Sequence, residues 1–402
     1  MGEFLRAEGV GGLGKGSNHT TPMNYIGIDI HKKSCVLSAL NEAGERVREA
    51  RIATNDRAGF AEFLRALGGP CKAVIEACWG WGKVHDLLEA TGLIGEVVLA
   101  HPYKTRIIAE AQIKTDKVDA RALAFLLRLG AVPRAHVPKL ATRRRKEVLR
   151  QRLFWVRERT KLRNRVHALL DRQNTELALP VCSDLFGVKG SRALEALASA
   201  LAEPDSTLLR QDLEVMKVLK VKTTELEKMI AAENQADGTA TLLATLPGVG
   251  LVLGALLACE VDDIARFNHP RKLVAYAGLA PTTYSSGEKT YHGRLLPQCN
   301  GWLRWAFVEA AWVAIGCDGY FGALYRRARE TGGHGANTAI IIVARRMAEI
   351  AWQMLARKRK YESRAPKAAA PQRVKTKAAK PNQQPHHLHT FPARSHISLA
   401  AS

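Results

Sequence analysis

The sequence predicts an α/β domain at the N-terminus, long helices in the middle and an all-α domain at the C-terminus. Three short β-like runs precede the first helix-like segment, and strand and helix patterns then alternate up to about residue 129. After residue 240, apolar helical patterns alternate with glycine-rich turns. The chain has 402 residues, which is long enough for two or three domains with substantial cores.

Five strands and three helices account for the N-terminal domain. The strand patterns cover residues 25–29, 34–40, 45–54, 72–77 and 95–100. Helix patterns cover residues 57–67, about 82–91 and about 118–129, and Asn55 or Asp56 is expected to cap the first of them. Three strands, a helix and then alternating strands and helices is the order of a ribonuclease-H-like domain, which has a mixed sheet with helices on its faces.

Four acidic residues occupy particular places in this order. Asp29 ends the first strand, Glu76 ends the fourth, and Asp116 and Asp119 lie three residues apart near the last helix. In such a fold the four acids would converge at one edge of the sheet. Asp116 and Asp119 would project from the same side, because residues three apart share one helix face. Clustered carboxylates repel each other, so they are tolerated mainly around hard divalent cations. The sequence therefore predicts a site for two Mg²⁺ ions, about 4 Å apart, which would hold the attacking and leaving oxygens of a phosphodiester.

Each acid taken alone has an ordinary structural explanation. Asp29 could accept a hydrogen bond from a turn amide, and Glu76 could be a surface acid at a strand end. Asp116 and Asp119 could cap a helix and favour its positive end. We favour metal binding because all four acids lie where this fold would bring them together.

Groups beside the predicted site permit two interpretations. Lys32 and Lys33 could contact phosphate oxygens or simply form a polar hairpin. His31 is expected to be a surface residue rather than a metal ligand. Trp79 and Trp81 could stack on a base, although packing against a helix is the more common role for such residues.

Positive charge is concentrated in two segments of a chain whose net charge is +22. Residues 139–172 contain 13 Lys and Arg against 3 acids, and residues 357–402 contain 11 against one. The rest of the chain is nearly neutral, which favours a nucleic-acid partner over a generally basic protein, or over a solvated helix face and a soluble tail. The residues expected to follow a phosphate backbone include Arg143, Arg144, Arg145, Arg157 and Arg163.

The middle of the chain has the pattern of two long helices. Apolar residues form an approximate stripe along the basic segment, and a second long helix is predicted over residues 208–230. A loop near residues 174–207 would join them. The two helices could form an antiparallel coiled coil, and their apolar stripes could also mediate dimerisation.

Residues 239–259 carry no charge and are long enough to span a membrane. Pro247, Gly248 and Gly250 interrupt this stretch, so we interpret it as a turn between two buried helices and expect no membrane association. The turn resembles a helix-hairpin-helix element, in which backbone N–H groups at Gly248 and Gly250 would bind phosphate. Helices are expected around residues 267–281, 300–315 and 336–357, with a polar, turn-rich segment at 282–294.

The seven cysteines are scattered without a CxxC pair, which favours reduced thiols in a cytosolic protein and argues against a zinc site. Composition and pattern predict five regions along the chain. These are a flexible extension at 1–22, a sheet-containing domain at 23–135, a basic coiled-coil region at 136–237, a C-terminal domain at 238–357 and a disordered basic tail at 358–402.

Several motifs, in this order along the chain, resemble one known family. They are "YIGIDIHKK", "VIEACWGWG", "KTDKVDARALA", "LATLPGVGLVLGALLACEV", "RFNHPRKLVAYAGLAP", "YSSGEKTYHGR" and "NGWLRWAFVEAAW". Together they are similar to the DEDD transposases of the IS110/IS1111 insertion-sequence group over about residues 24–357. The resemblance implies a RuvC-like domain, itself ribonuclease-H-like, joined through a coiled coil to a C-terminal transposase domain.

The resemblance also assigns roles to individual residues. It implies that the metal ligands are Asp29, Glu76, Asp116 and Asp119. It implies that Ser286, the serine before Gly287, is the nucleophile, with Ser285 as the neighbouring alternative. The acids and the serine lie about 170 residues apart, so two subunits could assemble the site.

The implied activity is site-specific DNA recombination in the bacterial cytoplasm, at the nucleoid. Members of the family pair a structured non-coding RNA with target and donor DNA, and the serine would form a covalent phosphoserine link until strand exchange. The chain departs from the family pattern at Gln298 and Cys299, where a basic residue is common, and at residues 332–340, which lack lysine. The alternative is a RuvC-like nuclease or junction resolvase that uses metal-bound water, and a third reading is a non-catalytic nucleic-acid binder.

Overall fold

The computed structural model describes residues 22–108, 116–173, 179–180, 182, 184–286 and 289–363. The described chain divides into two compact units, one ending at Val137 and the other beginning at Pro138. The predicted extension at 1–22, apart from its last residue, and most of the predicted tail lie outside the described residues.

The first unit is built on a mixed five-stranded sheet, and all five predicted strands are confirmed. They are β1 (Asn24–Ile30), β2 (Ser34–Leu40), β3 (Arg46–Ala53), β4 (Cys71–Glu76) and β5 (Glu96–Ala100). The strand order is β3-β2-β1-β4-β5. β2 runs antiparallel to β1 and β3, whereas β1, β4 and β5 are parallel to one another. The nearly continuous apolar residues of β1 and β4 fit this arrangement, because the central strands of such a sheet are buried on both faces.

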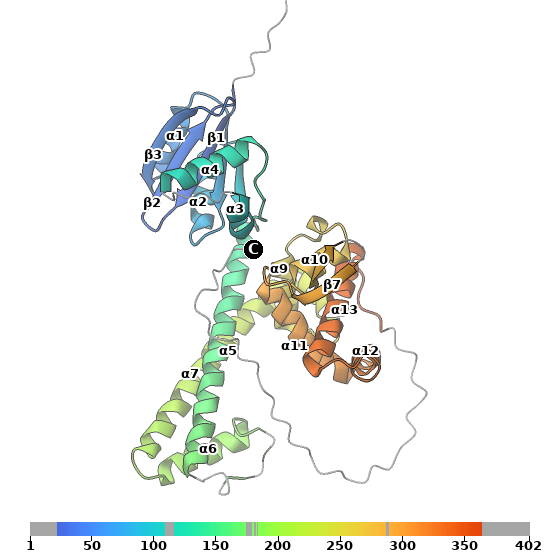
Figure 1. The fold of residues 1–402 in the computed structure, drawn as a ribbon. Helices are drawn as coiled ribbons and strands as arrows, with labels where there is room; N and C mark the ends of the chain where they lie inside the picture. The colour runs from blue at the N-terminus through green and yellow to red at the C-terminus, as the bar shows by residue number, and fades with distance from the viewer. Residues whose placement is uncertain are drawn as a thin grey trace, which may run out of the picture. The chain divides into compact units, whose positions relative to one another are not determined.

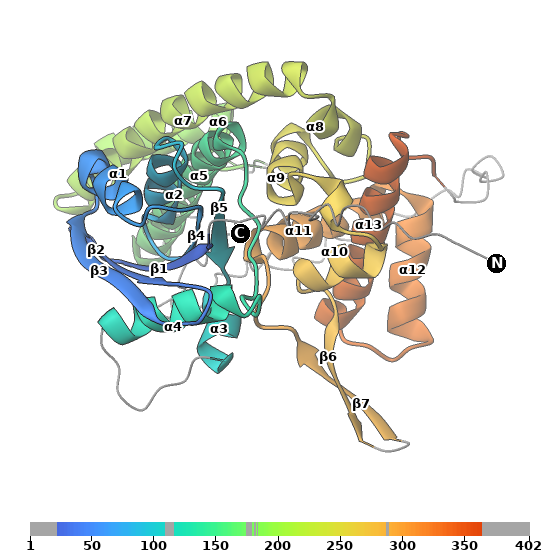
Figure 2. The ribbon, with the colours of Figure 1, turned by 90° about the horizontal axis from the view of Figure 1, so that it is seen from above.

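Helices cover both faces of this sheet (Figure 2). α1 (Arg57–Arg65) and α2 (Trp81–Glu89) cover one face, where Phe60 and Val84 pack with Ile26 of β1. α4 (Asp116–Arg128) covers the other face, where its leucines pack against β4 and β5. Asp56, one of the two caps that the sequence predicted, caps α1 by accepting a hydrogen bond from the N–H of Gly59 at 2.9 Å. The short helix α3 (Pro102–Ile108) was not predicted.

The second unit begins with a pair of long helices lying side by side (Figure 1). α5 spans Leu140–Gln173 and α7 spans Asp205–Ala236. Ion pairs from both ends of the pair show that the helices are antiparallel: Arg145 of α5 meets Asp237 just after α7, and Arg165 of α5 meets Asp212 of α7.

The predicted loop between these helices was wrong, because it contains helix α6 (Val188–Ala200). Leu194 and Ala198 lie on one face of α6 and bury themselves against Val166 and Leu170 of α5. An amphipathic segment of this length gains more from packing that face than from remaining a loop.

The remaining helices form the core of the second unit. They are α8 (Gly238–Leu243), α9 (Leu251–Val261), α10 (Pro270–Tyr276), α11 (Gly301–Cys317), α12 (Gly319–Glu330) and α13 (Ala336–Arg357), with a 3₁₀ turn, η2, at Ile264–Arg266. Leu149 and Leu153 of α5 and Ile230 of α7 are buried in this same core. The first turns of α5 are therefore part of the C-terminal core rather than a free connection.

The C-terminal domain is mainly helical, as predicted, but it is not all-α. Residues predicted as polar and turn-rich form an antiparallel hairpin of β6 (Pro281–Ser286) and β7 (Lys289–Leu295). Figure 2 shows this hairpin projecting from the helices of its own unit. Its strands are rich in threonine and tyrosine, which favour extended backbone even where their polarity suggests a loop. Helix α12 was also missed.

The uncharged stretch at 239–259 folds as α8, a turn and α9, as predicted. Gly248 has φ +78°, and a Cβ there would lie 2.1 Å from the carbonyl oxygen of Ala310 on α11. Gly248 therefore permits close packing of the turn against α11. In the described part of the chain no single helix is both long and apolar enough to cross a membrane, although α11 and α12 together reach that length and composition across a bend of 103°.

Candidate active site

Two of the predicted acids lie side by side at the same edge of the sheet. β1 and β4 are parallel with Ile28 opposite Ile75, and the next residues are Asp29 and Glu76. Side chains alternate along a strand, so Asp29 lies on the same face as Gly27, the face covered by α4. Glu76 lies on that face too, two residues after Val74, which packs against α4.

Gly27 explains how α4 brings the other two acids to this edge. A Cβ on Gly27 would lie 1.9 Å from the carbonyl oxygen of Ala120 and 2.5 Å from the nitrogen of Ala124, both on α4. The helix backbone therefore rests directly on β1. The first turn of α4, which carries Asp116 and Asp119, lies beside the end of β1 as a result.

The side chain of His31 bridges two of the acids. Its Nε2 atom lies 3.1 Å from Oδ2 of Asp29 and 3.1 Å from Oδ2 of Asp116. Sequence reasoning treated His31 as a surface residue. Its side chain is 41% exposed, yet it takes part in the acidic cluster.

Arg51 is a member of this site that the sequence did not reveal. It lies on β3, and its Nη2 atom is 2.8 Å from Oδ2 of Asp116. Its other Nη donates a hydrogen bond to the hydroxyl of Ser34 at 3.0 Å. The hydrogen bond from Arg51, with a smaller contribution from His31, lowers the pKa of Asp116. No local motif marks Arg51, because its partner is 65 residues away in the sequence.

The pKa values of two cysteines near these acids are also raised. Burial, followed by the charges of Glu76 and then Asp29, raises the pKa of Cys78 to about 11. Burial also raises the pKa of Cys35 to about 11; a hydrogen bond with Thr54 opposes the shift, and the charge of Asp29 adds to it. These thiols are therefore protonated at neutral pH and make poor nucleophiles.

The arrangement fits a divalent cation. Ligand atoms of Asp29, His31 and Asp116 all lie within 4.8 Å of one another. These atoms lie close enough together for one cation placed among them to contact all three residues. Carboxylate oxygens are the donors that hard cations prefer.

The surroundings of this edge are basic and aromatic. Lys32 and Lys33 are both exposed next to His31. Trp81 is only 8% exposed and packs at the start of α2, as sequence reasoning favoured. Trp79, in contrast, is 81% exposed.

The predicted nucleophile lies in the second unit. Ser286 is the last residue of β6 and pairs with Lys289 of β7, and Ser285 pairs with Thr290. The two residues that complete the turn lie outside the described chain.

The basic residues of α5 fall into two groups. Arg145 lies 2.6 Å from Asp237 and 3.4 Å from Glu233, so its charge is balanced within the unit. Arg144 and Arg157 are exposed, and the guanidinium of Arg157 lies 5.5 Å from the ring centroid of Trp302. Counting charges in the sequence therefore overestimates the positive charge available to a ligand.

Other residues that were predicted to bind nucleic acid take part in contacts within the protein. Arg163 stacks over Phe186 at 4.9 Å, and Gly250 immediately precedes α9 as its N-cap. Arg143 is only partly exposed.

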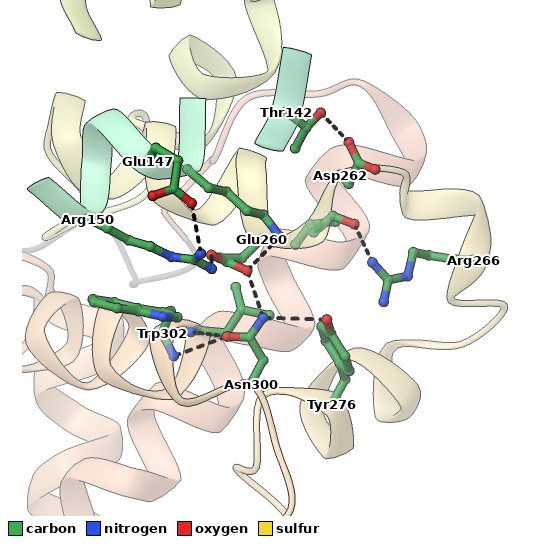
Figure 3. Close-up of polar contacts among 12 residues, drawn as sticks. Thr142, Glu147, Arg150, Glu260, Asp262, Arg266, Tyr276, Asn300 and Trp302 are labelled. Carbon is green, nitrogen blue, oxygen red and sulfur yellow. Dashed lines mark hydrogen bonds and ion pairs between the residues drawn. The ribbon is translucent and has the colours of Figure 1, made fainter. Parts of the chain in front are cut away.

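A buried polar network ties α5 to the C-terminal core (Figure 3). Glu260 of α9 is fully buried, and its Oε2 lies 2.9 Å from Nζ of Lys146, which is 4% exposed. Asn300 donates a hydrogen bond to the same oxygen at 2.9 Å. Its own side-chain oxygen caps α11 by accepting from the N–H groups of Trp302 and Leu303. The network therefore joins three helices at one buried charge.

Comparison with known proteins identifies the family. Residues 26–174 match the DEDD transposase model of the IS110 type, and residues 240–326 match the transposase IS116/IS110/IS902 family.

Curated relatives agree. The putative transposase y4rJ of Sinorhizobium fredii is 28% identical over 72% of this chain and 80% of the relative. The transposase of IS1328 from Yersinia enterocolitica is 26% identical over 82% of this chain and 96% of the relative. The transposase of IS1111A from Coxiella burnetii is 23% identical over 84% and 91%.

The chain belongs to the IS110 family of DEDD transposases. The family resemblance predicted from the sequence motifs is thereby confirmed. The protein is an insertion-sequence transposase, an enzyme that acts on DNA, and membership in the DEDD class implies the use of a divalent metal. Among the described residues, the acidic cluster of Asp29, His31 and Asp116 is one group whose ligand atoms lie close enough together to hold such an ion.

Proposed function

We propose that this transposase cleaves and exchanges DNA strands site-specifically, using the acidic cluster and Ser286. One observation carries the proposal. At the end of β1, next to Glu76, the Oδ2 atoms of Asp29 and Asp116 both lie 3.1 Å from Nε2 of His31. The strand order β3-β2-β1-β4-β5, with only β2 reversed between its neighbours, supports a ribonuclease-H-like, RuvC-like domain.

Asp29, Glu76, Asp116 and Asp119 would hold the metal, for which we propose Mg²⁺, with two ions in the site. When bound, Mg²⁺ supplies positive charge against the phosphate oxygens and lowers the pKa of a hydroxyl nearby. Arg51 now pairs with Asp116 at 2.8 Å, and Nε2 of His31 lies 3.1 Å from the same carboxylate. The contacts of Arg51 and His31 with Asp116 would have to lengthen when the carboxylates bind a cation.

Ser286 would be the nucleophile, with Ser285 as its alternative. The hydroxyl oxygen would attack the phosphorus and give up its proton, and the bond from phosphorus to the leaving oxygen would break. One strand end would then be held as a phosphoserine and the other released as a hydroxyl. The phosphoester preserves the bond energy, so the strand can be rejoined without ATP. A serine hydroxyl needs such activation because it is a weak nucleophile.

Nucleic-acid contacts would extend beyond this centre. We propose that exposed basic residues of α5, such as Arg144 and Arg157, bind DNA or a structured guide RNA from the same element. The N–H groups at Gly248 and Gly250 would add phosphate contacts of the helix-hairpin-helix kind. Sequencing the RNA that copurifies with the protein, together with the DNA flanking its gene, tests the guide.

We further propose that the transposase is a homo-oligomer that pairs through α7. This helix has a second apolar stripe on its outer side, including Val215, Val218 and Val221, which are 48%, 57% and 57% exposed. In an antiparallel pair with its two-fold axis at Val218, Val215 would meet Val221 and Glu214 would meet Lys222 of the second copy. Such a self-complementary stripe is what a two-fold interface requires.

Single substitutions test the chemistry. DNA carrying the ends of the element is incubated with the protein and Mg²⁺, and covalent protein–DNA adducts are separated on denaturing gels. We expect Ser286→Ala to abolish adducts while Mg²⁺ still raises the melting temperature, and Asp29→Asn to abolish both adducts and cleavage. Ser285→Ala is the matched control and should retain adducts. Unchanged strand cleavage in Ser286→Ala would instead support a nuclease that uses water.

A further inference from the structure

Trp79 is the most exposed of the large apolar side chains in the described chain, at 81%. Tryptophan is normally well buried on average, because its large apolar surface is costly to leave in water. Its neighbour Trp81, two residues later, follows this rule at 8% exposure. The turn that joins β4 to α2 therefore buries one indole and presents the other to solvent.

The backbone holds this exposed indole in a defined place. The N–H of Cys78 donates to the carbonyl of Glu76 at 2.8 Å, and the N–H of Trp81 donates to the carbonyl of Cys78 at 3.4 Å. Gly80 has φ +90°, a conformation that L residues with side chains rarely adopt. The segment is thus held between a strand end and a buried helix start, so the backbone that carries Trp79 has a defined conformation.

Trp79 also lies in the turn that directly follows the end of β4, where Glu76 is. It is three residues after Glu76, and the thiol next to it, Cys78, experiences the charges of both Glu76 and Asp29. Lys83 is exposed on the first turn of α2, and Lys32 and Lys33 are exposed beyond the end of β1. A flat aromatic surface beside cations and a carboxylate site matches the parts of a nucleotide: a base to stack and a phosphate to neutralise.

We propose that Trp79 is a base-binding site, on which an unpaired base of the DNA strand stacks while the adjacent phosphate enters the acidic cluster. The inference rests on the proposed function and adds a substrate-positioning contact to it. Stacking on an aromatic side chain tolerates any base, since every base has a π face. The indole would therefore orient the strand without reading its sequence.

The test measures binding of a fluorescein-labelled, single-stranded 20-nucleotide oligo(dT) to the full chain, without divalent cation so that no strand is cut. We expect Trp79→Ala and Trp79→Leu to weaken binding about tenfold, and Trp79→Phe to remain within about threefold of the parent. Phe125→Ala is the matched control and should not change binding. Phe125 is also an exposed aromatic residue of this unit, 46% exposed, but it lies nine residues along α4 from Asp116.

A second measurement locates the contact directly. An oligonucleotide with 5-iododeoxyuridine is irradiated in complex with the protein, and peptide mapping is expected to find the adduct on Trp79. Equal affinities for the leucine and phenylalanine variants, or an unchanged affinity for Trp79→Ala, would overturn the proposal. So would a change in the oligomer mass of Trp79→Ala, which would assign the indole to a protein interface.

Failure of the proposed function gives a different result. If Asp29→Asn cut DNA normally, the acidic cluster would not be the catalytic centre. The oligonucleotide binding and the cross-link would still report on Trp79, because neither measurement depends on cleavage.

Discussion

At the scale of single residues, Gly27 has the largest predicted effect on the active site. Gly27→Ala would place a Cβ against the backbone of α4, so the helix has to move away from β1. Overpacking of this kind costs about 1–3 kcal/mol and often more when backbone atoms are involved. We expect a lower melting temperature together with a loss of Mg²⁺-dependent stabilisation, measured by thermal unfolding with and without Mg²⁺.

Gly95→Ala serves as the control for this substitution. A Cβ on Gly95 would lie 3.5 Å from the carbonyl oxygen of Cys71, which is an ordinary contact distance. The change should stay within about 1 kcal/mol of the parent. Equal effects of the two substitutions would contradict the close approach of α4 to β1 as the reason for Gly27.

The buried pair of Lys146 and Glu260 gives a second prediction at this scale. Lys146→Met leaves the fully buried carboxylate, among the described residues, with Asn300 and the more distant Arg150. Removing one member of a buried pair costs about 3–5 kcal/mol, whereas replacing both can be nearly neutral. Chemical denaturation should therefore show a large loss for Lys146→Met and substantial recovery in the Lys146→Met, Glu260→Gln double variant. Additive losses would contradict a coupled pair.

Tyr361 predicts a dependence on alkaline pH. Burial, and then the charge of Asp318, raise the pKa of Tyr361 to about 12 from its ordinary value near 10. The hydroxyl donates to Oδ2 of Asp318 at 3.2 Å. A raised folded-state pKa contributes stability that is complete below about pH 10 and disappears as the pH rises towards 12.

Tyr361→Phe removes this contribution. We expect the variant to be about 1 kcal/mol less stable than the parent at pH 8, and the difference to shrink at pH 11. Urea titrations of both proteins at the two pH values measure it, and other groups that titrate in this range cancel in the comparison. A difference that is constant with pH would contradict the assignment.

At the scale of elements, the role of the exposed apolar stripe of α7 in pairing can be tested separately from the buried residues of the same helix. Val218→Glu places a charge at the proposed two-fold axis, where the two copies would repel each other, so we expect light scattering to show a smaller assembly. Thr224→Glu is the control, because Thr224 is exposed on a third side of the same helix. The folded chain should survive both changes. An unaltered mass for Val218→Glu would remove α7 from the interface.

Elements also show where prediction from the sequence worked and where it failed. The five strands were predictable because period-two and fully apolar patterns are local. The edge position of Asp29 and Glu76 followed from strand order, but the contribution of Arg51 required the spatial pairing of β3 with α4 across 65 residues. The hairpin β6–β7 was missed because its strands are polar, and α6 was missed because its buried face has few residues.

At the scale of the whole molecule, nucleic-acid affinity depends on which cations are free. Arg144 and Arg145 are adjacent in sequence, but Arg144 is exposed and Arg145 pairs with Asp237 and Glu233. Arg144→Gln should weaken DNA binding and reduce the slope of log affinity against log salt by about 1. Arg145→Gln should instead lower the stability of the fold by about 1–3 kcal/mol. Filter binding at several salt concentrations and thermal unfolding distinguish the two.

The 34-residue helix α5 contributes to two separate hydrophobic clusters, through Leu149 and Leu153 near its start and Val166 and Leu170 near its end. The number of residues between these two pairs determines the angle, about the helix axis, between the sides of α5 that face the two clusters. One extra residue between them would turn the distal half by about 100°, whereas seven would leave it within about 20° of its present angle. Because α7 packs alongside α5, insertions should be tolerated only as whole heptads made at matching places in both helices, and not singly.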